Sequence, residues 1–266
     1  MVSARAPGAR LEVRELSKTY VWGDEELPTL DRVQLTALAG EFIALIGPSG
    51  CGKSTLFHIL AGLEAPGSGE ILIDGQELDR RLGAFAFMPQ RDALLPWRRT
   101  LDNVTIGLEI AGVARARARA RAEPLLERFG LGGFEAAWPW QLSGGMRSRA
   151  AFLRTVLLGK PAMLLDEPFG ALDGITRSEL QQWLLEVWGE VGSTVALITH
   201  DVAEAVFLAD RVYVMTPRPG RIATVIEIDL PRPRTLAVQE SPEFGALEAR
   251  VREALREYAL TATITR

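Results

Sequence analysis

Apolar and polar positions along this chain follow two periodicities. Short unbroken apolar runs are typical of strands buried on both faces, and apolar residues every three or four positions are typical of helices. Strands are expected at residues 42–46, 84–88, 163–165, 194–198 and 211–215, and helices at 53–61, 142–158, 175–188 and 202–208. Because strands and helices alternate, the pattern predicts a parallel sheet covered by helices, an α/β fold.

The part of the chain before residue 90 departs from that alternation. Short strands are expected at 11–20, 33–38 and 70–73, and Asp74-Gly75 is a hairpin signal after the last of them. Residues 25–31 are expected to form a turn punctuated by Pro28. These elements predict an antiparallel β subdomain attached to the parallel core.

The middle of the chain is helical in character. Thr100 is expected to cap a helix that ends near Gly112, and a second helix is expected at 114–129. A final helix carries one apolar face. That face consists of Phe244, Leu247, Val251, Leu255 and Tyr258. The predicted organisation is 1–90 for the first part of the core with the β subdomain, 91–158 for an inserted helical subdomain, 159–230 for the second part of the core, and 231–266 for a linker and helix.

Composition narrows the function classes. With 266 residues, a net charge of −4 and a pI near 5.5, the chain is long enough for a large domain and disfavours nucleic-acid binding. No apolar run approaches the roughly eighteen residues of a membrane span. Residues 1–10 lack an apolar core, so no signal peptide is expected. Cys51 is the only cysteine, which excludes an intrachain disulfide and fits a reducing compartment.

Candidate chemistry is concentrated between the predicted strand at 42–46 and the helix after it. The residues there are Gly47, Pro48, Ser49, Gly50, Cys51, Gly52, Lys53, Ser54 and Thr55. Strand, glycine-rich loop and helix are the context in which G-x-x-x-x-G-K-[ST] binds phosphate through backbone N–H groups and a helix N-terminus. Lys53 is expected to meet the β- and γ-phosphates and Ser54 to ligate Mg²⁺. The core is therefore predicted to be a P-loop NTPase.

Two later strands end in polar residues. Asp166 and Glu167 follow the predicted strand at 163–165, at the sheet edge where open α/β sheets bind ligands. Asp166 is expected to hold the Mg²⁺ shell that Ser54 begins, and Glu167 to polarise a water against the γ-phosphate. His200 follows the strand at 194–198 and can donate to the γ-phosphate, although a lone histidine at a strand end is most often a packing residue. His58 is assigned to packing or exposure.

In this order the motifs resemble the ATP-binding cassette ATPases over residues 11–228. Residues 47–55 match the Walker A loop, 142–146 the signature, 163–167 the Walker B strand and 171–173 the D-loop. Gln90 matches the Q-loop glutamine and His200 the switch histidine. Met146 stands where the commonest signature has glutamine, a change frequent in one group of importers.

The resemblance implies a RecA-like core, ATP and Mg²⁺ as cofactors, and catalysis by Glu167 with His200, Lys53 and Gln90. Gln90 would also ligate the Mg²⁺, and Tyr20 would stack on adenine. Ser143, Gly144, Gly145 and Asp173 would bind nucleotide too. Because the signature starts a helix, one chain would carry two anion sites for one triphosphate. The family resolves this with a head-to-tail homodimer, in which the signature of one copy caps the ATP of the other.

Residues 95–104 and 217–221 resemble the nitrate, sulfonate and taurine importer cassettes. Some pyrimidine-precursor importers share these features, so the solute stays open. The resemblance implies a peripheral subunit on the cytoplasmic face of the membrane. It would bind permease subunits through a groove near residues 90–99, serve a solute-binding protein indirectly and bind no nucleic acid. The alternative is a soluble cassette ATPase acting on chromosomes, ribosomes or cofactor assembly, which the compact insert and single cassette disfavour.

Three groups of residues have competing interpretations. Two interpretations are equally favoured for Leu94, Leu95 and Trp97: they line the permease groove, or they pack the insert onto the core. The arginines at 115, 117, 119 and 121 are two apart and spread around a helix, which favours a solvated face over a nucleic-acid or lipid stripe. The tryptophans at 138, 140, 183 and 188 are expected to pack.

Overall fold

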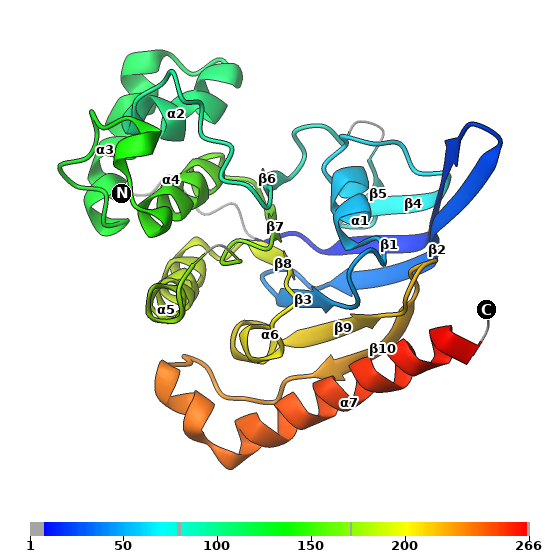
Figure 1. The fold of residues 1–266 in the computed structure, drawn as a ribbon. Coiled ribbons are helices and arrows are strands. Elements are labelled where there is room, and N and C mark those ends of the chain that lie inside the picture. Colours follow the sequence, from blue (N-terminus) through cyan, green and yellow to red (C-terminus); the bar gives the residue numbers. More distant parts are fainter. Residues whose placement is uncertain (1–7, 79–80, 171, 265–266) are drawn as a thin grey trace.

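The centre of the molecule is a six-stranded sheet with the order β10-β9-β3-β8-β7-β6 (Figure 1). Its strands are β3 (Phe42–Ile46), β6 (Ala86–Met88), β7 (Ala162–Asp166), β8 (Thr194–Ile198), β9 (Arg211–Met215) and β10 (Ile222–Glu227). All neighbours pair in parallel except β10, which is antiparallel to β9 at one edge. The computed structural model describes residues 8–78, 81–170 and 172–264. The expected parallel sheet is confirmed.

The apolar runs of the central strands are explained by burial on both faces. β3, β7 and β8 are buried along their whole length. In β3, Phe42, Ala44 and Ile46 belong to one apolar cluster, while Ile43 and Leu45 belong to a second. The first cluster includes α5 (Gly174–Val191), α6 (Val202–Leu208) and α7 (Pro242–Ile264), and the second includes α1 (Lys53–Leu60). Successive strand side chains point to opposite faces, and because both faces are covered, the strands are apolar apart from polar residues at their ends, such as Asp166 and Thr194.

A smaller antiparallel sheet has the order β2-β1-β4-β5. Its strands are β1 (Leu11–Trp22), β2 (Glu25–Ala37), β4 (Ser68–Ile73) and β5 (Gln76–Glu77). The hairpin at Asp74-Gly75 is confirmed. The turn expected at 25–31 is wrong, because β2 begins at Glu25 and the chain reverses at Gly23-Asp24. Pro28 pairs opposite Thr19 on an edge strand, where a missing N–H group costs little.

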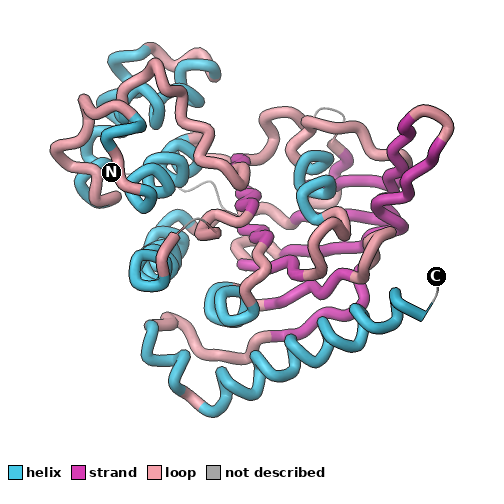
Figure 2. Tube along the Cα trace, in the orientation of Figure 1, coloured by secondary structure: helices cyan, strands magenta, loops and turns pink. Residues whose placement is uncertain are grey.

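Residues 91–158 contain helices and loops and no strand, and we call them the helical lobe; Figure 2 shows them beside the two sheets. Its helices are α2 (Thr100–Ile110), α3 (Arg115–Arg128) and α4 (Gly144–Leu157), with a short 3₁₀ turn, η1 (Pro139–Gln141). The capping role expected for Thr100 is wrong. Arg99 is the N-cap, and the Thr100 hydroxyl donates to the Ala137 carbonyl at 3.0 Å.

The arginine series of α3 serves both helix contact and solvation. Arg115 and Arg119 pair with Asp102 of α2 at 2.8 and 2.6 Å, and so hold the two helices together. Arg117 and Arg121 are exposed. The solvated face is therefore present, and it shares the helix with a contact that the sequence did not indicate.

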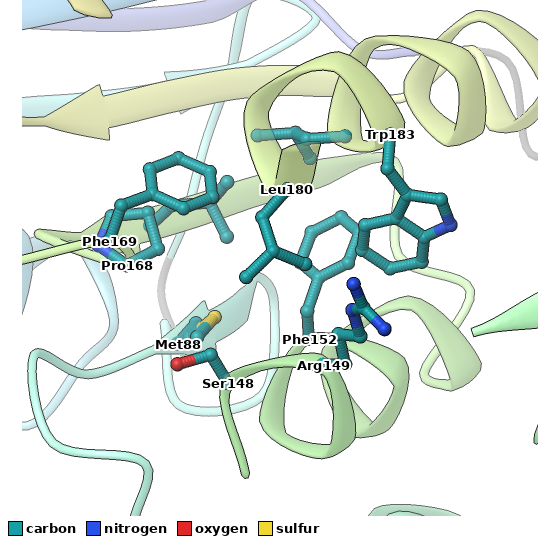
Figure 3. Close-up of a pocket in the computed structure, with 10 residues that line it drawn as sticks. Met88, Ser148, Arg149, Phe152, Pro168, Phe169, Leu180 and Trp183 are labelled. Carbon is teal, nitrogen blue, oxygen red and sulfur yellow. The ribbon is translucent and has the colours of Figure 1, made fainter. Parts of the chain in front are cut away.

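The helical lobe meets the core where α4 packs against α5. Phe152 of α4 and Trp183 of α5 lie edge to face, with ring centroids 5.4 Å apart, and they border a small apolar pocket with Leu180 and Phe169 (Figure 3). The expected packing of Trp183 is confirmed. At the surface Trp138 and Trp140 stack on each other at 5.2 Å.

Two of the tryptophans differ in their surroundings. Trp188 packs edge-on against Phe42, with centroids 5.6 Å apart, as expected. Trp140 is 65% exposed, and the packing expected for it is limited to its stacking on Trp138.

The last helix closes the fold over the edge of the large sheet. Phe244, Leu247 and Val251 are buried in the same apolar cluster as α6 and β9. The apolar face of α7 is therefore used inside this chain. None of the helices in the described part of the chain is both long and apolar enough to span a membrane.

Candidate functional site

Residues 47–55 connect β3 to α1, in the context that the sequence predicts. Gly52 is the N-cap of α1 and has a φ of 106°. A Cβ atom there would lie 2.7 Å from Leu30 Cδ2 and 3.0 Å from the Thr29 carbonyl oxygen, so only glycine fits. Because glycine offers no capping side chain, the first N–H groups of α1 are available to an anion.

The Lys53 side chain lies within this loop. Its Nζ donates to the carbonyls of Gly47 at 2.7 Å and Pro48 at 3.0 Å. The Cys51 thiol lies 3.7 Å from the same nitrogen and is buried. The loop therefore carries its positive charge at the point where its backbone would surround a phosphate.

Asp166 ends β7 and is 3% exposed. Burial raises the pKa of Asp166, and a hydrogen bond from the Ser54 hydroxyl opposes that rise. Its Oδ1 atom is buried and has no hydrogen-bond partner among the described residues. A hydroxyl beside an unpartnered buried carboxylate oxygen is a donor set that suits Mg²⁺. The pair fits a magnesium ion.

Magnesium is usually held by one or two protein ligands together with phosphates and water. In the described part of the chain, no group of three or more His, Cys, Asp or Glu side chains is arranged to hold a metal ion. Any cation at Asp166 and Ser54 would therefore arrive with oxygen ligands from its substrate.

Glu167 is contacted from two sides. Its Oε2 accepts a hydrogen bond from Gln90 Nε2 at 2.9 Å, and its Oε1 lies 3.5 Å from His200 Nδ1. Its φ of 46° is unusual for a residue with a side chain. Since its N–H group donates to the Ile198 carbonyl, the chain turns away only after one more pairing with β8. The Glu167 carboxylate is thereby placed between Gln90 and His200.

The structure thus brings Gln90, Glu167 and His200 together at the carboxyl ends of β6, β7 and β8. The Gln90 amide faces Glu167, and no described contact links it to Asp166. The Glu167 side chain is 21% exposed and that of His200 is 62% exposed. A half-sheltered carboxylate beside an exposed imidazole can accept a proton from water and donate to an oxyanion at the same edge.

Tyr20 of β1 lies close to the phosphate loop. Its hydroxyl donates to the Glu64 carboxylate, and Lys18 Nζ lies 5.0 Å from the ring centroid. Burial raises the pKa of Tyr20, the bond to Glu64 adds to this, and the Thr55 hydroxyl opposes it. The aromatic ring is therefore held beside Thr55, the last residue of the loop, with the Lys18 ammonium over it.

His58 of α1 has a packing role, as expected. Its Nδ1 lies 3.9 Å from a Glu64 oxygen, and its ring is edge-on to Phe87 with centroids 6.0 Å apart. It takes no part in the group formed by Glu167 and His200.

The signature segment lies apart from the phosphate loop. Ser143 caps α4, and its hydroxyl oxygen accepts from the Met146 N–H group at 3.2 Å. A Cβ atom on Gly145 would lie 2.8 Å from Thr176 Cγ2 of α5. Figure 1 shows α4 and α1 on either side of β6. Within one chain, then, the structure does not bring Ser143, Gly144 and Gly145 to residues 47–55.

Asp173 has a structural role within its own chain. Its Oδ1 atom accepts from the Thr176 N–H group at 3.1 Å and so caps α5. The same hydrogen bond lowers the pKa of Asp173. Its side chain is exposed beside the signature, and Ala171, part of the predicted D-loop, lies outside the described residues.

The residues of the predicted permease groove differ in exposure, so some pack onto the core and others face outward. Leu94 is 8% exposed and belongs to the main apolar cluster, so it packs the lobe onto the core. Trp97 is 70% exposed. Between them, Leu95 is half-buried, and its backbone is held by Asn103 through hydrogen bonds of 2.7 and 3.1 Å. The packing interpretation is therefore correct for Leu94, and Trp97 presents an open apolar surface.

The sequence pattern did not indicate three residues that contact the segments next to Gln90, Glu167 and His200. Arg154 of α4 donates to the carbonyls of Asp92 and Ala93 just after Gln90, at 2.6 and 2.7 Å. Arg177 and Glu204 border a small pocket that also contains Glu167 and His200. One signal was available for Glu204, which is a charged residue in the otherwise apolar stretch Val202–Leu208.

Comparison with known proteins relates this geometry to one family. A family model described as ABC transporter matches residues 30–170. An uncharacterized ABC transporter ATP-binding protein of Methanocaldococcus jannaschii is 43% identical over 235 residues, which is 88% of each chain. A taurine import ATP-binding protein, TauB, of Yersinia pestis is 38% identical over 237 residues, which is 87% of this chain and 93% of that protein.

Solved structures show the same likeness. A bacterial ABC transporter cassette solved as a dimer matches with a TM-score of 0.73 at 31% identity, covering 82% of this chain and 98% of that one. A dimeric post-hydrolysis state of the same cassette, bound to ADP and phosphate, matches equally well, with a TM-score of 0.73.

Proposed function

This chain belongs to the ABC transporter family and is an ATPase that uses ATP with Mg²⁺, and from that premise we propose that it powers import of a small solute. The observation that carries the proposal is the convergence of Gln90 and His200 on Glu167, beside the unpartnered Asp166 oxygen. Those groups supply a proton acceptor, an oxyanion donor and a cation ligand at one sheet edge.

Each side chain has a proposed task. Lys53 and the N–H groups of residues 47–55 bind the β- and γ-phosphates, and Tyr20 stacks on the adenine. Ser54 and Asp166, with Gln90, hold Mg²⁺, which neutralises phosphate charge. Glu167 orients the attacking water and accepts its proton.

His200 completes the group. Its imidazole donates to the γ-phosphate oxygens, and its contact with Glu167 keeps both side chains at the same point.

A second copy of the chain supplies what one chain lacks. We propose a head-to-tail homodimer in which Ser143, Gly144 and Gly145 of one copy face the ATP held by the other, with Asp173 at the same interface. The separation of α4 from the phosphate loop supports this, because the exposed start of α4 is a second anion site. ATP would hold the two copies together, and hydrolysis would release them.

The solute and the membrane partners are proposed from two likenesses. The taurine import ATP-binding protein supports a taurine-like solute, and the resemblance of residues 95–104 and 217–221 to importer cassettes adds nitrate, sulfonates and pyrimidine precursors. Permease subunits would bind near residues 90–99, where Trp97 is exposed, and a solute-binding protein would act through them. The protein would then sit peripherally on the cytoplasmic face of the membrane. A cassette ATPase uncoupled from transport is the less favoured alternative.

Replacing Glu167 with Gln tests the mechanism. The amide keeps the shape of the side chain but cannot accept a proton, so ATP turnover should fall roughly 1,000-fold while Mg-ATP still binds. Because bound ATP is then not consumed, the variant should accumulate as an ATP-dependent dimer. The measurements are steady-state phosphate release and size-exclusion chromatography with light scattering.

The exposed Glu179 of α5 offers a matched control, since Glu179→Gln makes the same chemical change away from the site. It should hydrolyse ATP like the wild type and form no trapped dimer. If Glu167→Gln turns over normally and stays monomeric with ATP, the base assignment and the dimer switch are both wrong.

A further inference from the structure

Two helices behind Glu167 and His200 are joined by a pair of polar contacts. Arg177 and Gln181 are one turn apart on α5, and they face Asp201 and Glu204 at the start of α6. Arg177 Nη1 lies 3.4 Å from Asp201 Oδ2, and Gln181 Nε2 donates to Glu204 Oε2 at 3.0 Å. We call these two contacts, and the four residues that make them, the α5–α6 polar pair. The proposed mechanism uses none of them.

Arg177 reaches a second segment with its other terminal nitrogen. Nη2 donates to the Leu172 carbonyl at 3.0 Å. Leu172 immediately precedes Asp173, and its N–H group donates back to the Phe169 carbonyl at 3.1 Å, in the turns that follow Glu167. One guanidinium therefore holds both the segment after Glu167 and the segment after His200.

Asp201 divides its carboxylate between two tasks. Its Oδ1 accepts from the Glu204 N–H group at 3.2 Å and caps α6, while Oδ2 faces Arg177. The Asp201 N–H group donates to the Thr199 hydroxyl at 3.0 Å, so His200 is enclosed between two anchored neighbours. The Arg177 guanidinium is therefore linked through Asp201 to the chain on either side of His200.

A role in stability alone does not account for this arrangement. The Arg177 and Asp201 side chains are 30% and 33% exposed, and a half-exposed pair at 3.4 Å adds little to folding. Arg177 Nε is buried and has no hydrogen-bond partner within the described chain. The guanidinium is thus held by its two ends only, at the junction of two loops that border the catalytic carboxylate.

We propose that Arg177 is a positioning residue that ties the Leu172–Asp173 segment to the His200 loop, so that docking of a second copy at Asp173 sets the distance between His200 and Glu167. This rests on the homodimer of the proposed function. Arg177 makes no contact with the phosphate loop in the described structure, so its effect is on turnover and not on ATP affinity.

The test compares Arg177→Met, Arg177→Lys, Asp201→Asn and the Arg177→Met/Asp201→Asn double variant. The steady-state kcat and KM for ATP are measured, with binding of a fluorescent ATP analogue in parallel. Arg177→Met should lower kcat roughly 10- to 100-fold, because misplacement by about 1 Å is enough for such a loss. KM and analogue affinity should stay within about twofold of the wild type.

The other variants give the pattern that a merely structural role would not. Lysine keeps the charge but reaches one partner at a time, so Arg177→Lys should restore part of kcat. Asparagine still caps α6, so Asp201→Asn isolates the ion pair and carries the test if Arg177→Met fails to fold. The double variant should be no slower than Arg177→Met, since both changes remove one interaction.

Arg128→Met is the matched control. Arg128 pairs with Glu190 at 2.6 Å near the far end of α5, so its loss removes an arginine–carboxylate contact of the same helix away from Glu167. Its kcat should be unchanged. A normal kcat in Arg177→Met, or losses that multiply in the double variant, would overturn the inference. If Glu167→Gln traps no dimer, the proposed function fails instead, and the two failures are thereby distinguished.

Discussion

The core and the helical lobe each present a helix N-terminus suited to phosphate. They differ in which side chains lie around that N-terminus. In the core, the start of α1 carries Lys53, and Asp166, Glu167 and His200 lie at the carboxyl ends of the neighbouring strands β7 and β8. In the lobe, the start of α4 has Ser143 as its own cap and the side of α5 as its neighbour.

That difference has a physical origin. Parallel strands bring the residues at their carboxyl ends to one edge, so a single chain gathers the groups of the core by folding. The helical lobe packs on the core where α4 meets α5, and the start of α4 at Ser143 and Gly144 is exposed. The same chain therefore carries one site that folding completes and, in the proposed homodimer, a second site that another copy completes.

The largest expected effect concerns the core alone. Asp166→Asn removes a cation ligand, so Mg²⁺-dependent turnover should fall roughly 1,000-fold or more. Burial raises the pKa of Asp166, so its charged form is disfavoured in the folded state and the variant should melt at a higher temperature without nucleotide at neutral pH. That gain in melting temperature should shrink as pH falls toward the usual pKa range of aspartate. Asp166 of the wild type is then protonated, so its burial no longer costs stability.

Two measurements check this prediction: phosphate release, and thermal melting at several pH values. Mixing Asp166→Asn with Lys53→Ala should leave the mixture inactive, since each composite site of the dimer then has one damaged core. Recovery of activity in that mixture would show that the core groups do not act together within one chain.

The next effect separates the two regions directly. Lys53→Ala damages the core and Gly144→Asp puts a negative charge at the start of α4, so each alone should be inactive. In a head-to-tail dimer of one of each, one site combines an intact core with an intact signature. An equal mixture should then recover about a quarter of wild-type ATPase activity, if copies pair at random and sites act independently.

Gly144 can be replaced without disturbing the fold. A Cβ atom there would lie 3.8 Å from Leu172 Cδ2, an ordinary contact, and an acidic residue is tolerated at a helix start. The measurement is phosphate release after mixing and ATP-driven exchange of subunits. A mixture that stays inactive, with both proteins folded, would mean that the signature acts within its own chain.

The smallest effect belongs to the α5–α6 polar pair. Burial raises the pKa of Glu204 to about 7; the nearby charge of Asp201 adds to this, while Thr199, Gln181 and Arg177 oppose it. Because the folded state then binds more protons than the unfolded state, wild-type stability should fall between about pH 4.5 and 7 and level off above.

Glu204→Gln lacks that titration. Its stability relative to the wild type should increase by about 2 kcal/mol from pH 5 to pH 8, as measured by urea denaturation. Glu179→Gln, on the exposed side of α5, should show no such trend. Parallel stability curves for Glu204→Gln and the wild type would contradict the role of a buried, titrating carboxylate.

Much of the fold and the site was predictable because it depends on local rules. The strands at Thr194–Ile198 and Arg211–Met215 and the helix at Val202–Leu208 have the bounds that the apolar pattern predicts. Where the prediction failed, a neighbour outside the segment decided the outcome. Residues 25–31 became part of β2 because β1 offers a partner, and Thr100 lost its capping role because Ala137 accepts its hydroxyl.

The phosphate loop, the acidic end of β7 and the alternation of strands and helices can be read from the amino-acid order, since glycine conformation, strand burial and helix periodicity act over a few residues. The folded chain was needed to show that Gln90 and His200 meet at Glu167, that Arg177 joins two loops, and that α4 lies apart from α1. Contacts between residues far apart in the chain depend on how the sheet orders its strands, and no local pattern encodes that order.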